Sequence, residues 1–244
     1  IFLRTFGCQM NERDSEMLAG MLQGMGMREA ADRTEADLVL FNTCCVRDNA
    51  ERRALGNVTW LRQLKKDRPA LKIGVCGCMV QQPGMAERIL KQYPFIDLAF
   101  GTHNLHQLPS LLYAMLADHR RVVRVTDQDT LIAEGLPTQR QFDYKAYITV
   151  MYGCDNYCSY CIVPYVRGHE RSRAMAGVLR EAETLLASGV QEIMLLGQNV
   201  NSYGSGSAET FPRLLRELDA MGVPRIRFMT SHPKDLSDAL IEAM

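Results

Sequence analysis

The sequence contains no apolar run that approaches the roughly 20 residues of a membrane-spanning helix. No signal-peptide pattern opens it. Neither positive nor negative charge is in excess, because 28 Lys and Arg residues balance 28 Asp and Glu residues. This balance excludes a strongly basic, histone-like protein and an acidic disordered tail. We therefore expect a globular, cytoplasmic protein without a membrane partner.

The two ends lack the features of a complete protein. The first residue is Ile1 rather than Met, and it already lies in a strand-like run. The helical pattern over 235–244 has neither a C-cap glycine nor a proline stop. We therefore expect the sequence to be part of a longer protein.

Strand-like and helix-like stretches alternate in the first half of the chain. Apolar runs typical of strands occur at 1–6, 37–41, 71–76 and 95–100. Helical periodicity occurs at 14–24, 48–66, 85–92 and 105–118. This alternation predicts an α/β domain over 1–118, built on a doubly wound parallel sheet.

The second half repeats the alternation after a polar segment. Residues 119–143 have little periodicity beyond a possible short strand at 121–125, and they predict a linker. Over 144–244, strand-like runs at 146–151, 192–196 and 225–229 are each followed by a helical pattern. Three βα units are too few to close a barrel, which again leads us to expect part of a longer protein.

Eight cysteines stand out in a chain expected to be cytoplasmic, where metal or cluster binding is favoured over disulfides. Cys8, Cys44 and Cys78 each follow a predicted strand of the first domain. The carboxyl ends of parallel strands share one edge of the sheet, so we expect these three thiols to converge there. Cys45 and Cys76 are interpreted as small apolar residues.

The remaining cysteines, Cys154, Cys158 and Cys161, lie in one loop, GCDNYCSYC, with the spacing C-x3-C-x2-C. Structural zinc sites use four ligands, usually in paired C-x2-C units, and no fourth ligand is near this loop in the sequence. Three thiolates on one short loop favour a 4Fe–4S cluster with one iron open to a small ligand.

Several long motifs make the chain resemble the radical S-adenosylmethionine (SAM) methylthiotransferases: TFGCQMNERDSE, FNTCCVRDNAE, VCGCMVQ, GCDNYCSYCIVPYVRGHERSR, LLGQNVNSYG and TSHP. The resemblance covers essentially the whole chain. It implies that 144–244 form the first three βα units of a radical-SAM partial barrel. The family has a longer barrel and a C-terminal RNA-binding TRAM domain, neither of which is complete here.

The resemblance also implies cofactors, substrate and partners. Cys154, Cys158 and Cys161 match the ligands of the cluster that cleaves SAM. The ligands of an auxiliary, sulfur-bearing 4Fe–4S cluster are matched by Cys8, Cys44 and Cys78. The implied reaction adds a methylthio group to carbon 2 of N6-isopentenyladenosine next to the tRNA anticodon. An external electron donor and a sulfur donor are the further partners expected.

Weaker candidates lie in loops and in basic stretches. Candidate contacts to SAM are Gln198, Asn199, Ser231 and Tyr160, with His232 a similar candidate. Candidate contacts to SAM carboxylate or RNA phosphate are Arg167, Arg171 and Arg173. Residues 47–72 carry eight basic against three acidic side chains, which form either an RNA-contacting face or an ordinary solvated helix.

Three other functions would also use cysteine-rich motifs of this kind. A sister methylthiotransferase would act on threonylcarbamoyladenosine in tRNA or on an aspartate of a ribosomal protein, but GQNVNSYG favours the isopentenyladenosine enzyme. A non-catalytic electron carrier typically needs four cysteines per cluster, whereas this chain offers two sets of three. A zinc-dependent RNA-binding module is the third alternative.

Overall fold

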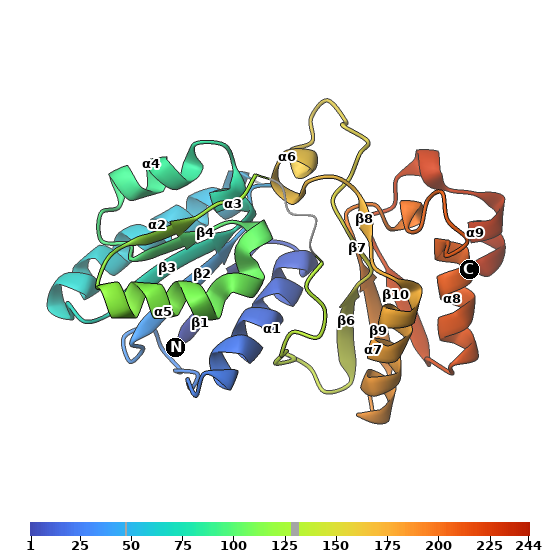
Figure 1. Ribbon diagram of the computed structural model, residues 1–244, viewed down its shortest axis with the longest axis horizontal. Helices are drawn as coiled ribbons and strands as arrows, with labels where there is room; N and C mark the ends of the chain where they lie inside the picture. Colours follow the sequence, from blue (N-terminus) through green and yellow to red (C-terminus); the bar gives the residue numbers. More distant parts are fainter. Residues whose placement is uncertain (47, 128–131) are drawn as a thin grey trace. The chain divides into compact units, whose positions relative to one another are not determined.

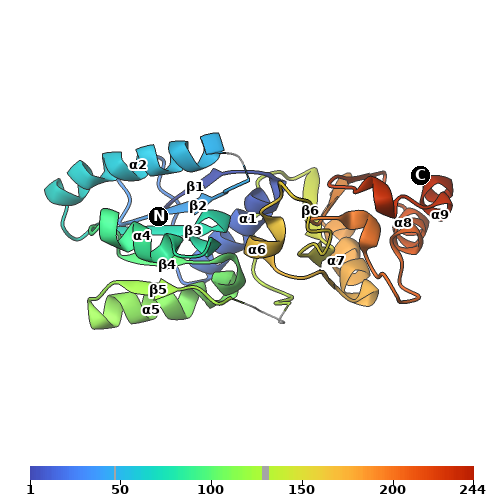
Figure 2. The same ribbon diagram turned by 90° about the horizontal axis from the view of Figure 1, so that it is seen from above.

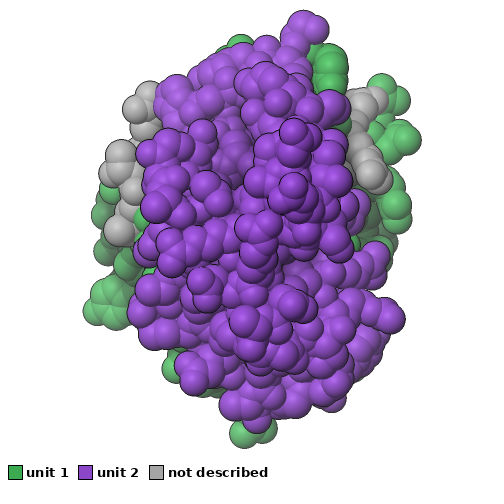
Figure 3. Space-filling view, turned by 90° about the vertical axis from the view of Figure 1, so that its right-hand side faces the viewer, with its two compact units in different colours: residues 1–139, 160–167 green, residues 140–159, 168–244 purple. Residues whose placement is uncertain are grey.

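A computed structural model describes residues 1–46, 48–127 and 132–244 (Figure 1). The described chain divides into two compact units, which Figure 3 shows in different colours. Unit 1 comprises Ile1–Gln139 and Tyr160–Arg167, and unit 2 comprises Arg140–Ser159 and Gly168–Met244. In the predicted linker 119–143, residues 128–131 lie outside the described residues.

Unit 1 is built on a five-stranded parallel sheet with strand order β1-β2-β3-β4-β5. The prediction of an α/β fold with a parallel sheet is thus confirmed. The strands are β1 (Phe2–Phe6), β2 (Leu38–Thr43), β3 (Lys72–Gly77), β4 (Leu98–Phe100) and β5 (Val122–Arg124).

Helices cover both faces of this sheet (Figure 2). Alternate residues of β2 point to opposite faces, as the pleat of a strand requires. Val39 and Phe41 pack with α2 (Asp48–Asp67) and α4 (Met85–Gln92). Leu38 and Leu40 pack with α1 (Gln9–Gly24) and α5 (Leu108–Asp118). Two buried apolar layers therefore hold the central strands rigidly in place.

Two helices of unit 1 begin at residues that the sequence pattern did not indicate. Helix α1 begins at Gln9, immediately after Cys8, whereas apolar periodicity indicated a start near Asp14. Residues Gln9–Arg13 are mostly polar, so the apolar periodicity did not indicate that the helix begins there. The expected helix 105–118 is divided into a 3-10 helix, η1 (Thr102–Gln107), and α5, whose second residue is Pro109.

Unit 2 contains a parallel sheet of three strands, β6 (Lys145–Thr149), β9 (Glu192–Leu196) and β10 (Arg225–Phe228). Its core packs these strands against α7 (Met175–Ala187), α8 (Phe211–Ala220) and α9 (Asp238–Ala243). Short antiparallel strands, β7 (Met151–Tyr152) and β8 (Arg171–Ser172), follow β6 and precede α7. The three predicted βα units are present.

Short helices complete the two units. In unit 1 these are α3 (Cys78–Gln81) and α6 (Val163–Arg167). In unit 2 they are the 3-10 helices η2 (Val200–Ser202) and η3 (Pro233–Asp235). Among the described residues, no helix has both the length and the apolar character needed to cross a membrane.

Candidate functional site

Cys8, Cys44 and Cys78 lie at one edge of the sheet in unit 1. In the strand register, Phe6 pairs with Thr43 and Thr43 pairs with Gly77. Cys44 and Cys78 directly follow the last two of these residues, and Cys8 caps helix α1 just after β1. The structure therefore brings together the three cysteines that were expected to converge.

The three thiols interact electrostatically. Cys44 donates a hydrogen bond to Cys8, which lowers the pKa of the exposed Cys8 thiol to about 6 and raises the pKa of Cys44. Burial raises the pKa of Cys78, whereas the nearby Arg167 guanidinium acts to lower it. A thiolate is thus already favoured at Cys8 near neutral pH, and thiolates are the form that binds iron.

A buried network of amide side chains supports this edge. Asn11 Nδ2 donates to Asn42 Oδ1 and to the Thr43 carbonyl oxygen, each at 3.2 Å. Asn42 Nδ2 donates to the Asn11 carbonyl at 2.8 Å and to Ser15 Oγ at 2.9 Å. The network ties the first turn of α1, which follows Cys8, to the end of β2, which precedes Cys44. The sequence did not indicate these residues, because the one feature that marks them is that they lie within a few positions of Cys8 or Cys44.

Two glycines allow the backbone to approach closely here. Gly77 has φ +96°, and a Cβ atom on it would lie 2.5 Å from both Asn42 Oδ1 and the Thr43 carbonyl oxygen. A Cβ on Gly7 would lie 2.7 Å from the Cβ of Cys44. Larger residues at either position would displace the side chains that hold the cysteines.

The other two cysteines of unit 1 face elsewhere. Cys76 is fully buried in β3 and packs with the apolar layer formed by α1 and α5. Cys45 is half-buried and packs with the opposite layer. Burial raises the pKa of Cys45 to about 12. Both residues behave as apolar side chains, as their interpretation from the sequence proposed.

Arg167 belongs to this site rather than to a surface. Its side chain is 5% exposed, and its Nη2 atom lies 2.6 Å from the Asp14 carboxylate, which is 0% exposed. Its Nε atom donates to the Cys78 sulfur at 3.2 Å. The expectation that Arg167 contacts RNA is therefore corrected, because its guanidinium is buried between an acid and a thiol.

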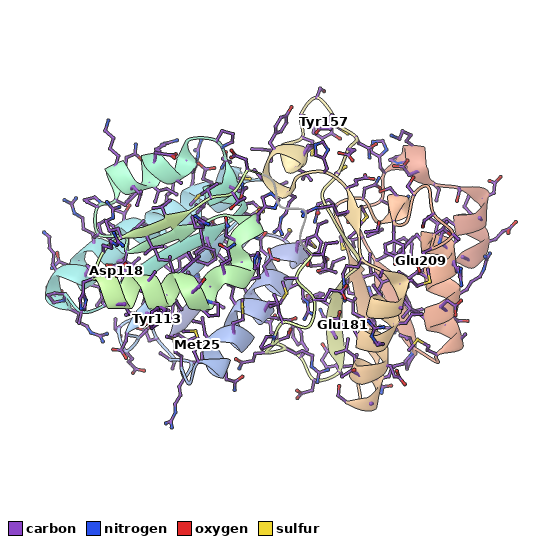
Figure 4. The ribbon with its side chains drawn as sticks, in the orientation of Figure 1. Met25, Tyr113, Asp118, Tyr157, Glu181 and Glu209 are labelled. Carbon is purple, nitrogen blue, oxygen red and sulfur yellow. The ribbon has the colours of Figure 1, made fainter. Side chains whose placement is uncertain are left out.

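The loop that carries Cys154 and Cys158 begins directly after β7 in unit 2. Gly153 has φ +77°, and a Cβ on it would collide with the carbonyl oxygens of Gly168 and His169. The amide of Cys154 donates to the Gly168 carbonyl at 3.1 Å. Cys154 is buried, Cys158 is half-buried, and Tyr157 points outward from the loop (Figure 4). Half-buried Cys161 is grouped with unit 1.

A histidine from the loop after β10 approaches the Cys154–Cys158 loop. His232 Nε2 lies 3.7 Å from Cys158 Sγ, and Lys234 Nζ donates to Asn156 Oδ1 at 2.6 Å. The turn 231–234 thus contacts the cysteine loop by two polar side chains within unit 2. The sequence indicated this turn only as a weak candidate.

The candidate SAM contacts differ in their surroundings. Gln198 Oε1 accepts from the Gly153 amide, while its buried Nε2 has no hydrogen-bond partner among the described residues. Asn199 is buried, and it bonds Asp235 Oδ2 and the His232 amide. Ser231 is exposed, and Tyr160 is 91% exposed. Only Gln198 therefore combines burial beside the loop with a donor left over.

The other two basic candidates, Arg173 and Arg171, contact side chains within unit 2. Arg173 is buried, and it pairs with Glu181 of α7 at 2.7 Å, a position that Figure 4 labels. The expectation that Arg173 contacts RNA is therefore corrected as well. Arg171 is half-buried, with its guanidinium 5.9 Å from the Tyr152 ring centre.

The basic stretch 47–72 is only partly available to solvent. Lys65 pairs with Asp97 at 2.8 Å, and Arg68 lies 3.2 Å from Asp37. Arg47 lies outside the described residues. The exposed basic side chains on α2 are Arg52, Arg53, Arg62 and Lys66.

In residues 1–46, 48–127 and 132–244, no three His, Cys, Asp or Glu side chains gather closely enough to hold a single metal ion. A 4Fe–4S cluster makes a different demand, because each thiolate binds a different iron and the thiolates are spread around the cluster. The spacing of Cys8, Cys44 and Cys78 at the carboxyl ends of the strands in unit 1 suits a cluster better than a single metal ion.

Comparisons with known proteins agree with this organisation. Residues 1–101 match the "Uncharacterized protein family UPF0004", and residues 148–244 match the "Radical SAM superfamily". Two similar curated proteins are called tRNA-2-methylthio-N(6)-dimethylallyladenosine synthase. The one from Clostridium perfringens is 52% identical and the one from Acetivibrio thermocellus 56% identical, each over 99% of this chain. The chain spans 55% and 51% of their lengths.

The fold has a counterpart among solved structures. A radical S-adenosylmethionine methyltransferase, TsrM from Kitasatospora setae, matches with a TM-score of 0.62 and 16% identity. The match covers 99% of this chain and 56% of that protein, and at this identity it shows the fold alone. The resemblance to the radical SAM methylthiotransferases is confirmed by the curated relatives. The chain therefore contains a UPF0004 domain and a second domain that belongs to the radical SAM superfamily.

Proposed function

We propose that the protein is a radical SAM methylthiotransferase that adds a methylthio group to carbon 2 of N6-isopentenyladenosine next to the tRNA anticodon. The observation that carries the proposal is the gathering of Cys8, Cys44 and Cys78 at one sheet edge. The same chain carries the C-x3-C-x2-C loop of a radical SAM domain. Relatives named for this reaction match nearly the whole chain.

The donors at the sheet edge fit an auxiliary 4Fe–4S cluster. Cys8, Cys44 and Cys78 supply three thiols, and the bare α-carbons of Gly7 and Gly77 leave the backbone close to them. A buried cation, Arg167, offsets the negative charge of thiolates there. We assign these three cysteines as ligands of that cluster.

The donors of the second domain fit a SAM-binding cluster. Cys154, Cys158 and Cys161 are three thiols on one loop, a set that leaves one iron open. Gln198 Nε2 is a buried donor without a partner beside that loop, which suits a polar group of SAM. When bound, the cluster at this loop supplies the electron that cleaves SAM, and the auxiliary cluster supplies the sulfur.

The chain's own residues have positioning tasks in this scheme. Gln198 holds the start of the loop through the Gly153 amide and presents its free N–H to SAM. Asn199 bonds the backbone of His232 and so fixes the turn beside Cys158. Of Arg167, Arg171 and Arg173, we retain Arg171 as the proposed contact to RNA phosphate. Ser231 and Tyr160 remain proposed contacts to SAM.

The domains and partners follow from the same proposal. We assign residues 1–118 to the auxiliary-cluster domain, 119–143 to a linker and 144–244 to the radical SAM domain. The tRNA must present an unstacked adenosine, because carbon 2 of a stacked base is out of reach. An external electron donor and a sulfur donor complete the reaction, which we place in the cytoplasm with the tRNA. The relatives' names favour this substrate over those of the sister enzymes.

Mass spectrometry of tRNA nucleosides tests the proposal. A strain that lacks the gene is expected to lose 2-methylthio-N6-isopentenyladenosine and to accumulate N6-isopentenyladenosine. The wild-type gene restores the product, whereas Cys44→Ser and Cys154→Ala genes do not. Persistence of the methylthiolated nucleoside in the deletion strain would reject the proposed function. Loss of a methylthiolated threonylcarbamoyladenosine instead would identify the sister reaction.

A further inference from the structure

Arg167 connects a buried carboxylate to one of the proposed cluster thiols within unit 1. Its Nη2 atom donates a hydrogen bond to Asp14 Oδ2 at 2.6 Å, and its Nε atom donates one to Cys78 Sγ at 3.2 Å. An arginine guanidinium stays protonated in proteins, and this one presents two different N–H groups to two different partners.

The backbone around Arg167 is fixed by a separate contact. Arg167 ends the short helix α6, and the preceding residue, Val166, is fully buried. Thr102 Oγ1 of η1 donates to the Val166 carbonyl at 2.6 Å. The guanidinium thus reaches Cys78 from a segment anchored in unit 1, which limits the conformations that its side chain adopts.

We propose that Arg167 is a positioning residue for Cys78 that tunes the reduction potential of the auxiliary cluster, with Asp14 as the counter-charge that orients it. This inference rests on the proposed function, because it assumes a cluster at Cys8, Cys44 and Cys78. Arg167 acts through the Cys78 sulfur and touches no substrate atom in the proposal.

The direction of the tuning follows from charge. Reduction adds an electron to the cluster, and a hydrogen bond to a ligating sulfur stabilises that added negative charge. Arg167 therefore raises the potential. Asp14 acts in the opposite sense, and its Oδ1 atom has no hydrogen-bond partner among the described residues that would disperse its charge. Because the two side chains together are neutral, their joint removal isolates the hydrogen bond from the net charge.

The test uses a background that holds only the auxiliary cluster. In the triple variant Cys154→Ala/Cys158→Ala/Cys161→Ala, the potential is measured by anaerobic spectroelectrochemistry together with iron and sulfide content. Arg167→Met is expected to lower the potential by at least about 59 mV, a tenfold change in the ratio of reduced to oxidised cluster for one electron. Asp14→Asn is expected to raise it. The double variant Arg167→Met/Asp14→Asn is expected to lower it less than Arg167→Met.

Further variants separate tuning from a merely structural ion pair. Arg167→Lys keeps the charge and is expected to give a potential between those of wild type and Arg167→Met. Arg121→Gln is the matched control, because Arg121 donates to carbonyls before β4, at the opposite edge of the sheet. It is expected to leave the potential unchanged. If Arg167→Met binds no cluster, the shifts of Arg167→Lys and Asp14→Asn in opposite directions decide the matter.

The outcomes distinguish the inference from the proposed function. Unchanged potentials in Arg167→Lys, Asp14→Asn and the double variant, with the iron content of one cluster retained, would overturn the tuning role and leave the proposed function intact. A triple variant that binds no iron–sulfur cluster at all, while its fold is retained, would overturn the proposed function itself. A shift of the same size in Arg121→Gln would also overturn the inference, since it would show no special role for Arg167.

Discussion

The Nε2 atom of His232 lies 3.7 Å from the Sγ atom of Cys158, although 74 residues separate the two in the sequence. The other ring nitrogen, Nδ1, accepts a hydrogen bond from the Lys234 amide at 3.2 Å. That bond assigns the ring proton to Nε2. His232 therefore presents a donor to the Cys158 sulfur, as outer-shell residues do for metal-bound thiolates.

Replacing His232 by Phe is expected to leave the cluster at Cys154, Cys158 and Cys161 bound but to slow SAM cleavage about 10–100-fold, as losses of outer-shell hydrogen bonds do. Production of 5′-deoxyadenosine by the anaerobically reconstituted protein measures this. The control is His106→Phe in the other unit, at a half-buried histidine outside the loop. Equal rates for wild type and His232→Phe would show that the contact has no catalytic consequence.

Cys44→Ser and Cys45→Ser are expected to differ sharply although the residues are neighbours. The Cys44 thiol forms a hydrogen bond with Cys8 at the carboxyl end of the sheet, whereas Cys45 packs against the apolar layer that contains α2. Cys44→Ser therefore removes the auxiliary cluster, while Cys45→Ser keeps both clusters at a cost of about 1 kcal/mol in the free energy of unfolding. Mössbauer spectra and denaturant unfolding measure the two effects. Equal loss of iron in both variants would show that the ligand assignment is wrong.

The reactivity of Cys8 in the metal-free protein is expected to depend on pH in an unusual range. Because its pKa is lowered to about 6, the thiolate is the main form above pH 6. Alkylation of Cys8 by iodoacetamide should rise through pH 6 and level off by about pH 7. In Cys44→Ala, which lacks the hydrogen-bond donor, the rise should move toward pH 8–9, near the usual thiol range of about 8.5. Mass spectrometry of peptides resolves each cysteine, and an identical profile in both proteins would contradict the proposed interaction.

Gly77→Ala is expected to lower the free energy of unfolding by more than about 2 kcal/mol, because a side chain is strained at φ +96° and meets Asn42 and Thr43. Auxiliary-cluster content should fall with it, since Cys78 is the next residue. Gly56→Ala is the control, because that glycine lies within α2 with open space around it. It should be neutral or stabilising by up to about 1 kcal/mol. Urea unfolding measures both variants, and a neutral Gly77→Ala would show that the tight approach is not needed.

The sequence predicted the strands and the convergence of Cys8, Cys44 and Cys78 because both depend on local patterns. Apolar runs locate parallel strands, and each of the three thiols follows a strand end. The same pattern separated Cys44 from Cys45, since neighbouring side chains point in different directions.

The role of Arg167 was not predictable in this way. A run of arginines after the cysteine loop has the composition of a basic surface, and nothing local reveals that Asp14, 153 residues away, neutralises one of them. The pair of Arg173 and Glu181 spans only eight residues, but nothing in the composition of this stretch indicates that Arg173 is buried. Long-range pairs of buried charges lie beyond the reach of periodicity and spacing.

Iron and sulfide analysis combined with Mössbauer spectroscopy of the anaerobically reconstituted protein tests the central claim most directly, because that claim is that two sets of three cysteines hold two clusters. The account predicts about eight irons per chain in wild type, and about four both in Cys8→Ala/Cys44→Ala/Cys78→Ala and in Cys154→Ala/Cys158→Ala/Cys161→Ala. It also predicts 5′-deoxyadenosine production from SAM in wild type and in the first variant, but not in the second. About four irons in wild type, or an unchanged iron content in either folded variant, would contradict it.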